Sequence, residues 1–415
     1  MDACPSASRF LSLPGLPRRP GASSFRRVRS PTRSGSTAIG SAIPHPEKPG
    51  KATAGFTPSA AGISGPVAGD EHDDRQQTGT PVTQKRRPLF FCLNGSRKLG
   101  EAVADLLGWP PDEHEEREFE NGEHKARPLV EVGGRDVYLL HHLEGEAPRS
   151  GQPAQSANDK LIRILFFTGA LKHAGARTVT TITPYLPYAR KDRRTKARDP
   201  VSMRYVATLF EAMGTEALIT LDIHNLAAFE NAFRTCRAEN LTAAGVLARA
   251  MIPLLGDQPV AVVSPDAGGE KRAEIFRVLL ERETGKPVGN ALLEKHRSGG
   301  VVSGSLFAGD VDGRTAIIID DMISSGGTIM RAVQACRDNG AERVFAAATH
   351  GLFSQGANQL FEQGGPDRIF VTDSVTIPKG LSSERLQIVS VAPLLADAMA
   401  RLSNGEPLYD LVPYI

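Results

Sequence analysis

Cysteine is scarce in this chain of 415 residues, and the four cysteines lie far apart, at positions 4, 92, 236 and 336. None of them forms the closely spaced pairs that bind zinc, so the pattern predicts reduced thiols in a reducing compartment. No apolar run approaches the roughly 20 residues that a membrane helix needs, and we expect no membrane partner. The formal net charge of +2 is too small to indicate a nucleic-acid partner.

The first 87 residues are rich in Pro, Gly, Ser, Thr and Ala and contain few large apolar side chains, which predicts a disordered tail. The first 45 residues carry seven arginines and one acidic residue, Asp2. An Arg- and Ser-rich start resembles an organellar transit peptide, whereas prolines at 14, 17 and 20 oppose an amphipathic helix. A disordered tail, a targeting segment and an over-long predicted start all remain open.

The rest of the chain is long enough for two ordinary domains, and its composition of 40% hydrophobic and 23% charged residues is typical of a soluble globular protein. From Arg87 onward, strand patterns alternate with helical ones, which predicts an α/β protein with parallel sheets. Residues 172–183 and 337–348 both read as a helix end, a glycine and a strand, which favours two similar domains. The expected strands are 87–93, 135–140, 178–183, 217–221, 260–263, 291–293, 317–319 and 343–349, and the expected helices are 98–107, 159–173, 202–213, 243–254, 271–283 and 329–336.

The most informative stretch is 315–328, where an isoleucine run is followed by Asp320 and Asp321 and then by a Ser/Gly loop that opens a helix. In a βαβ unit, loop amides and the helix N-terminus at the carboxyl end of the strand form an anion site. The two carboxylates suit ribose hydroxyls or a hydrated Mg²⁺. The alternative is an ordinary glycine-rich turn with acidic caps, but two adjacent aspartates favour a binding site. The residues expected to cradle a phosphate are Ser324, Ser325, Gly326, Gly327 and Thr328.

Polar groups also follow other expected strands. Asp222 and His224 come after 217–221, in a spacing that suits a cation or a phosphate, although a buried structural histidine is the alternative. Asp266 precedes two glycines that permit close backbone approach, and its alternative is a helix cap. Lys295 and Arg297 alternate on an extended segment, so either they close over a transferring phosphate or they are a solvated pair.

A basic run follows the strand 178–183. By itself it is consistent with a nucleic-acid patch or a solvated loop. Because the run lacks interleaved aromatic residues and the whole chain is near neutral, we expect it to bind a nucleotide triphosphate rather than a nucleic acid. The basic residues are Arg190, Lys191, Arg193, Arg194, Lys196 and Arg198.

Taken in order, these motifs resemble the ribose-phosphate diphosphokinase family, also called phosphoribosyl pyrophosphate (PRPP) synthetases. The resemblance runs from about Pro88 to Gly405. It rests on the residues 119–123, 187–190 with the basic run, 222–224, 264–269, 295–297, 320–328 and 349–353.

The resemblance implies two phosphoribosyltransferase-type domains with parallel-sheet cores. We expect the tail at 1–87, an ATP-side domain at 88–239, a ribose 5-phosphate-side domain at 240–390 and a helix and tail at 391–415 that return to the first domain. It also implies Mg²⁺-dependent transfer of the β,γ-diphosphoryl group of ATP to the anomeric hydroxyl of ribose 5-phosphate. A cytoplasmic homo-oligomer with sites shared between subunits is expected.

Residue by residue, Lys295 and Arg297 are similar to the pair that stabilises the transition state. His224 and Asp266 resemble the groups that hold Mg²⁺. Asp320 and Asp321 resemble the residues that accept hydrogen bonds from the ribose hydroxyls, and residues 324–328 resemble the loop that binds the 5-phosphate. The positions similar to ATP-binding residues are Phe119, Asn121 and Glu123, which reach into a neighbouring subunit's site, and Arg190, Lys191 and Asp192.

Three positions depart from the family pattern. Lys191 stands where many members have Gln, which leaves the nucleotide preference open. Ser324 stands where many have Asp, so phosphate activation and feedback inhibition are not assumed. The loop 144–156 is longer than usual.

Two other functions remain as alternatives: a catalytically silent regulator that binds synthetase subunits, and a phosphoribosyltransferase that consumes PRPP. The first has no physical need for Lys295 and Arg297, and the second has no need for the first domain.

Overall fold

A computed structural model describes residues 86–145, 155–298, 301–378, 380–381 and 383–412, and gives only the backbone for 295–298 and 301–305. The expectations for the N-terminal tail and for most of the loop 144–156 therefore lie outside the described residues. In the described part, no helix is long and apolar enough to span a bilayer.

The first sheet contains five strands, all paired in parallel, in the order β1-β4-β5-β6-β7. Successive side chains of β1 pack on opposite faces: Phe90 joins one apolar cluster and Phe91 joins another. Both faces are therefore buried, as expected for parallel strands whose residues are apolar without interruption. The strands are β1 (Leu89–Cys92), β4 (Asp136–Leu140), β5 (Thr178–Ile182), β6 (Ala217–Leu221) and β7 (Arg237–Leu241).

The second sheet has seven strands in the order β10-β9-β8-β11-β12-β13-β14. Only β10 is antiparallel to its neighbour, and it forms a hairpin with β9. The expected βαβ unit is present, because β11 and β12 pair in parallel and α7 connects them. The strands are β8 (Val260–Ser264), β9 (Val288–Ser298), β10 (Val301–Gly309), β11 (Thr315–Ile323), β12 (Arg343–Gly351), β13 (Arg368–Thr372) and β14 (Leu386–Val389).

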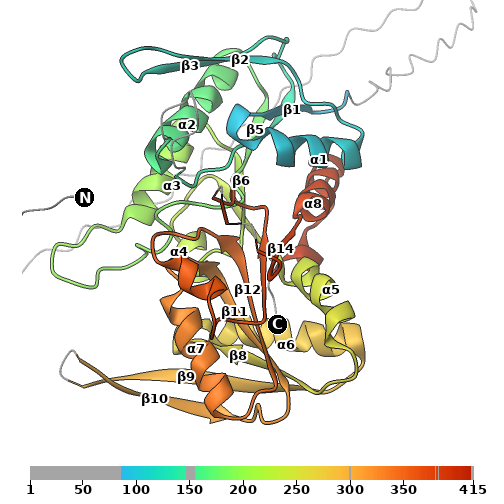
Figure 1. Ribbon diagram of the computed structural model, residues 1–415. Coiled ribbons are helices and arrows are strands. Elements are labelled where there is room, and N and C mark those ends of the chain that lie inside the picture. The colour runs from blue at the N-terminus through green and yellow to red at the C-terminus, as the bar shows by residue number, and fades with distance from the viewer. Residues whose placement is uncertain (1–85, 146–154, 299–300, 379, 382, 413–415) are drawn as a thin grey trace, which may run out of the picture. The chain divides into compact units, whose positions relative to one another are not determined.

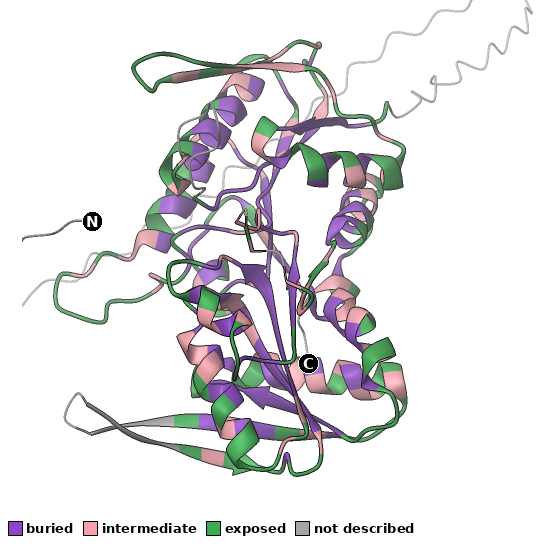
Figure 2. Cartoon of the chain, viewed as in Figure 1, coloured by how far each residue is buried: buried purple, intermediate pink, exposed green. Residues whose placement is uncertain are grey.

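Helices cover both faces of the sheets, and the buried positions follow the strands (Figures 1 and 2). Gly175 and Gly340 lie in the two similar junctions between a helix and the next strand. Their φ angles are 87° and 84°, conformations that glycine adopts without strain. The helices are α1 (Arg97–Leu107), α2 (Ala157–His173), α3 (Ser202–Ala212), α4 (Leu226–Glu230), α5 (Ala244–Leu255), α6 (Glu270–Thr284), α7 (Gly327–Asp338) and α8 (Ala392–Asn404).

One apolar cluster is shared by the two sheets. It contains Phe90 from the first sheet, Ile317 from the second and Leu395 from α8, all fully buried. The helix α8 packs against α1 of the first half of the chain, and Figure 1 shows the two side by side. The continuous core fixes the carboxyl edges of the two sheets against each other.

The α/β architecture with parallel sheets is confirmed, and the predicted strands and helices are found within a few residues of their expected positions. The strands β7, β10, β13 and β14 and the helix α4 were not predicted. The sequence patterns did not reveal β2 (His114–Glu118) and β3 (His124–Pro128), which form a separate antiparallel hairpin of mostly charged and polar residues. The expected domain boundary at 239/240 falls inside β7, so we propose that the first domain ends after Leu241.

Candidate active site

The strand β11 carries the two aspartates past the end of its neighbour β8. Pairing with β8 ends at Ile318, whereas pairing with β12 continues through Asp320 to Ile323. Ile317 and Ile319 pack into the cluster shared by both sheets, and Ile318 packs into the cluster on the other face. Because the isoleucines fix the strand on both faces, the carboxylates that follow them have a fixed position at the sheet edge.

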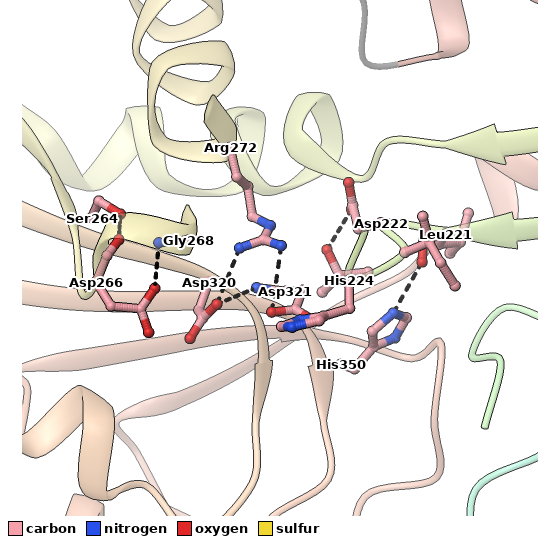
Figure 3. A network of polar contacts seen from close by, with 12 residues as sticks. Leu221, Asp222, His224, Ser264, Asp266, Gly268, Arg272, Asp320, Asp321 and His350 are labelled. Atoms are coloured by element: carbon pink, nitrogen blue, oxygen red, sulfur yellow. Dashed lines mark hydrogen bonds and ion pairs between the residues drawn. The ribbon is translucent and has the colours of Figure 1, made fainter. Parts of the chain in front are cut away.

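Arg272 of α6 connects the two carboxylates (Figure 3). Its guanidinium lies 3.1 Å from Oδ1 of Asp320 and 3.5 Å from Oδ1 of Asp321. The Asp321 backbone N–H also donates to Oδ1 of Asp320, over 2.8 Å. Arg272 was not among the predicted site residues, because a charged residue near the start of a helix is not a signal of function by itself.

The two neighbouring carboxylates differ in their affinity for a proton. Burial and the negative charge of Asp321 raise the pKa of Asp320 to about 7, against the opposing charge of Arg272. Burial would also raise the pKa of Asp321, but the hydrogen bond from His224 and the charge of Arg272 outweigh it and hold that pKa well below its usual value. Asp321 is therefore the ionised member of the pair near neutral pH.

His224 comes from the first sheet and meets β11 of the second. It lies in the loop after β6, just before Asn225, whose side chain accepts from the Ala228 N–H and caps α4. The His224 Nδ1 is 2.9 Å from Oδ2 of Asp321, and 43% of the side chain is exposed. The hydrogen bond to Asp321 raises the pKa of His224, against the effect of burial.

The predicted phosphate loop lies between β11 and the start of α7. Gly326 has φ of 81° and ends the loop, and a Cβ there would come within 2.8 Å of Leu360, so the position requires glycine. The Ser324 hydroxyl pairs with the Ser354 hydroxyl at 2.9 Å. The free N–H groups of the first turn of α7 and the loop amides are the usual elements of a phosphate site.

A cavity of about 1280 Å³ is lined by residues of both sheets. Eleven of the predicted site residues line it, from four separate segments of the chain. They are Arg190, Asp192, His224, Asp266, Asp320, Asp321, Ser324, Ser325, Gly326, Gly327 and Thr328. The cavity also includes residues that the sequence analysis did not assign, such as Lys271 and Arg272 of α6 and Asn225, whose side chain donates to Asp192 over 2.5 Å.

Four other predicted residues with described side chains do not line this cavity. Phe119, Asn121 and Glu123 occupy the exposed turn of the β2–β3 hairpin and do not line this cavity. Lys191 is also outside the lining, with its Nζ 2.7 Å from Asp199. The assignment of the hairpin turn to a neighbouring subunit's site stays a prediction.

Lys295 and Arg297 lie on the backbone of β9, paired with Ser305 and Val302 of β10. The sequence analysis placed them on an extended segment, and their backbone forms a strand whose pairing with β10 shifts register between Val302 and Ser305. The part of β9 that carries both residues extends beyond its pairing with β8, which ends at Leu292.

The residues His224 and Asp266 were predicted to hold Mg²⁺. Both line the cavity, and Oδ1 of Asp266 accepts the Gly268 N–H over 3.1 Å. Across the described part of the chain, no three His, Cys, Asp or Glu side chains cluster as a ready metal site. The donors nevertheless fit Mg²⁺, because this ion keeps several waters and is commonly held by one or two carboxylates together with substrate phosphates.

Comparison with known proteins agrees with this geometry. Residues 89–214 match the N-terminal domain of ribose phosphate pyrophosphokinase, and residues 304–412 match the phosphoribosyl synthetase-associated domain. The ribose-phosphate pyrophosphokinase 2 of Enterococcus faecalis is 32% identical over 328 residues, which cover 78% of this chain and 96% of that protein. The chain belongs to the ribose-phosphate pyrophosphokinase family.

Two further members of the family extend the comparison. The ribose-phosphate pyrophosphokinase of Ureaplasma parvum is 34% identical over 322 residues, covering 76% of this chain and 92% of that one. The crystal structure of phosphoribosylpyrophosphate synthetase from Mycobacterium smegmatis aligns with a TM-score of 0.68 at 31% identity. It covers 77% of this chain and 100% of that one, so the family fold accounts for both sheets.

Proposed function

We propose that this member of the ribose-phosphate pyrophosphokinase family transfers the β,γ-diphosphoryl group of ATP to the anomeric hydroxyl of ribose 5-phosphate, giving PRPP and AMP. One observation carries the proposal: the aspartate pair and phosphate loop of the second sheet share a cavity with Arg190 and His224 of the first. A site with a carboxylate pair and anion loop on one side and cationic groups on the other suits a sugar phosphate and a nucleotide triphosphate together.

The second sheet is assigned to ribose 5-phosphate. The loop 324–328 would bind the 5-phosphate through its amides and hydroxyls at the N-terminus of α7, where the helix dipole favours an anion. Asp320 and Asp321 would accept hydrogen bonds from ribose hydroxyls. Arg272 holds both carboxylates in place and neutralises part of their charge next to the phosphate.

The first sheet is assigned to ATP. Arg190, Lys191 and Asp192 would bind the nucleotide, and the hairpin turn that contains Phe119, Asn121 and Glu123 would complete the site of a neighbouring copy in a homo-oligomer. The exposure of that turn, with Phe119 40% exposed, is what a contact with another subunit requires. A hydrated Mg²⁺ held at His224 and Asp266 would neutralise phosphate charge when bound.

In the proposed reaction the anomeric oxygen of ribose 5-phosphate forms a bond to the β-phosphorus of ATP. The bond from that phosphorus to the oxygen bridging the α- and β-phosphates breaks, AMP leaves with this oxygen, and the hydroxyl proton is released. Such transfers depend on positioning and charge stabilisation rather than on a covalent nucleophile. Lys295 and Arg297, carried by the β9–β10 hairpin, are the proposed donors to the transition state.

The cytoplasm is the compartment that we propose. Cys92, Cys236 and Cys336 are free and buried, as expected for thiols of a reducing compartment.

An assay of purified protein with ribose 5-phosphate, ATP and Mg²⁺ tests the proposal. We expect AMP and PRPP to appear together, and both to be lost when ribose 5-phosphate is omitted. Folded protein that forms no AMP over a range of phosphate concentrations would refute the synthetase activity. Release of pyrophosphate from added PRPP and a free base, without the forward reaction, would instead support a PRPP-consuming transferase.

A further inference from the structure

Asp222 lies at the junction of the two sheets, two residues before His224, yet nothing in the proposed reaction uses it. It follows directly after β6 and adopts φ of 37°, a left-handed conformation that is uncommon for a residue with a side chain. Such a conformation persists where surrounding contacts enforce it. The contacts of its carboxylate therefore indicate what the position is for.

Three donors from two parts of the chain converge on this carboxylate. Its Oδ1 accepts from the Thr242 hydroxyl over 2.9 Å, and its Oδ2 accepts from the Ala243 N–H over 2.8 Å. The third donor is the hydroxyl of Thr349 in β12, over 2.5 Å to Oδ2. Thr242 and Ala243 join β7 to α5, whereas Thr349 belongs to the second sheet, so the carboxylate bonds to both halves of the protein.

The residue before Asp222 makes a second connection to the same strand. The carbonyl oxygen of Leu221 accepts a hydrogen bond from Nε2 of His350, over 3.1 Å, and His350 is 2% exposed (Figure 3). The Nδ1 of His350 lies 2.9 Å from the Ser374 hydroxyl, which holds the ring in place. Two neighbouring residues of the first sheet are thus attached to two neighbouring residues of β12.

These bonds set the position of the residues that follow. Because His224 is two residues beyond Asp222, fixing Leu221 and Asp222 to β12 restricts where the imidazole can lie relative to β11, the neighbour of β12. On the cavity side, the 2.9 Å contact between His224 and Asp321 also connects the two sheets.

We propose that Asp222 is a positioning residue, not a metal ligand: its carboxylate aligns the ATP half of the cavity with the ribose half through the bond to Thr349. The Asp-x-His spacing in the sequence suggests a cation site, but both carboxylate oxygens already accept hydrogen bonds from protein donors. Three of the roughly four lone-pair sites of the carboxylate are therefore used by protein donors, which leaves about one for a metal ion. The catalytic consequence rests on the proposed function, whereas the connection between the sheets does not.

The test compares two matched threonine variants. Thr349→Val removes the donor from the second sheet, and Thr242→Val removes a donor from the first sheet to the same carboxylate. Misalignment by about 1 Å can cost on the order of 10²-fold in rate. We therefore expect Thr349→Val to lower kcat by about 10-fold or more, with the KM for ribose 5-phosphate changed less than about threefold. Thr242→Val should keep kcat within about twofold, and Thr349→Ser, which retains the hydroxyl, should restore it.

The Mg²⁺ dependence distinguishes positioning from metal binding. In Asp222→Asn the amide keeps the shape but cannot accept all three bonds, so kcat should fall while the Mg²⁺ concentration for half-maximal activity stays that of the wild type. A large rise in that concentration for Asp222→Asn alone would overturn the proposal. Equal kcat values for Thr349→Val and Thr242→Val would also overturn it.

A measurement without turnover keeps the inference separate from the proposed activity. If the Asp222–Thr349 bond joins the sheets, the double variant Asp222→Asn/Thr349→Val should lose less thermal stability than the sum of the two single losses. Additive losses would contradict the bond. If the losses of thermal stability are less than additive but the protein makes no PRPP, the proposed function is refuted, whereas the bond between the two sheets is supported.

Discussion

At the scale of single residues, the acidic pair at the end of β11 depends on one guanidinium. Asp320 and Asp321 are neighbours in the sequence and both are largely buried, a situation in which two negative charges repel each other strongly. Arg272 contacts both, and His224 contacts Asp321. The charge that a sugar phosphate meets at this edge is therefore set by two residues from outside β11.

Replacing Arg272 tests this dependence. Because charged hydrogen bonds contribute about 1.5–3 kcal/mol, we expect Arg272→Ala to lower kcat/KM for ribose 5-phosphate by about 10- to 100-fold. Arg272→Lys should not restore full activity, since a lysine lacks the planar fork that reaches two carboxylates. Arg277→Ala is the matched control on α6, because Arg277 pairs with Glu274 and Glu281 of its own helix. Equal activity of the two alanine variants would contradict the role of Arg272.

The proposed transition-state donors give a second prediction at this scale. Lys295→Ala should lower kcat by on the order of 10²-fold, as loss of one such donor does, and should leave the melting temperature unchanged. Lys286→Ala provides a control, since this lysine pairs with Asp257 on the surface. Normal turnover of Lys295→Ala would contradict the proposed role of Lys295 as a donor to the transition state.

At the scale of elements, the end of β4 leads into buried titratable groups. His141 is 1% exposed, and its Nε2 has no hydrogen-bond partner among the described residues. Burial, reinforced by the positive charges of Lys160 and Arg163, holds the pKa of His141 well below its usual value. The imidazole is therefore neutral in the folded protein and takes up a proton on unfolding.

This difference predicts loss of stability in mild acid. A folded-state pKa below the unfolded value means that the unfolded chain binds more protons, so stability is lost as the pH falls below about 6.5. The free energy of unfolding should fall by about 1.4 kcal/mol per pH unit for each such histidine. His141→Asn should reduce this slope in urea titrations between pH 7 and 5. An unchanged slope in His141→Asn would contradict the assignment.

Local sequence patterns predicted many of the strands and helices. Each strand that they predicted contains a continuous or alternating run of apolar residues. The patterns did not reveal β7, β10, β13, β14 and α4. They also failed for β2 and β3, whose charged and polar side chains form a hairpin that packs on α2. At the site, the phosphate loop was predictable because its glycines and its following helix are adjacent in the sequence. Arg272 and the Asp222–Thr349 bond were not, since they join residues 48 and 127 positions apart.

At the scale of the whole molecule, the two sheets share one apolar cluster and a set of polar bonds that border the cavity. The phosphate loop belongs to the second sheet, and Arg190 and His224 belong to the first. Both sheets are therefore needed to form the cavity. None of the proposed site residues lies in residues 1–85, so a variant that lacks them should retain kcat within about twofold, by the usual tolerance of terminal changes. Loss of activity in that variant would show that the N-terminal segment takes part in catalysis or assembly.

The most direct measurement is ³¹P NMR of the wild-type protein with ATP, ribose 5-phosphate and Mg²⁺. We expect AMP and PRPP to form in equal amounts as ATP is consumed, because the diphosphoryl group moves as a unit. Formation of ADP with a sugar bisphosphate, which indicates transfer of the γ-phosphoryl group alone, would contradict it. So would the absence of any ribose 5-phosphate-dependent consumption of ATP by folded protein.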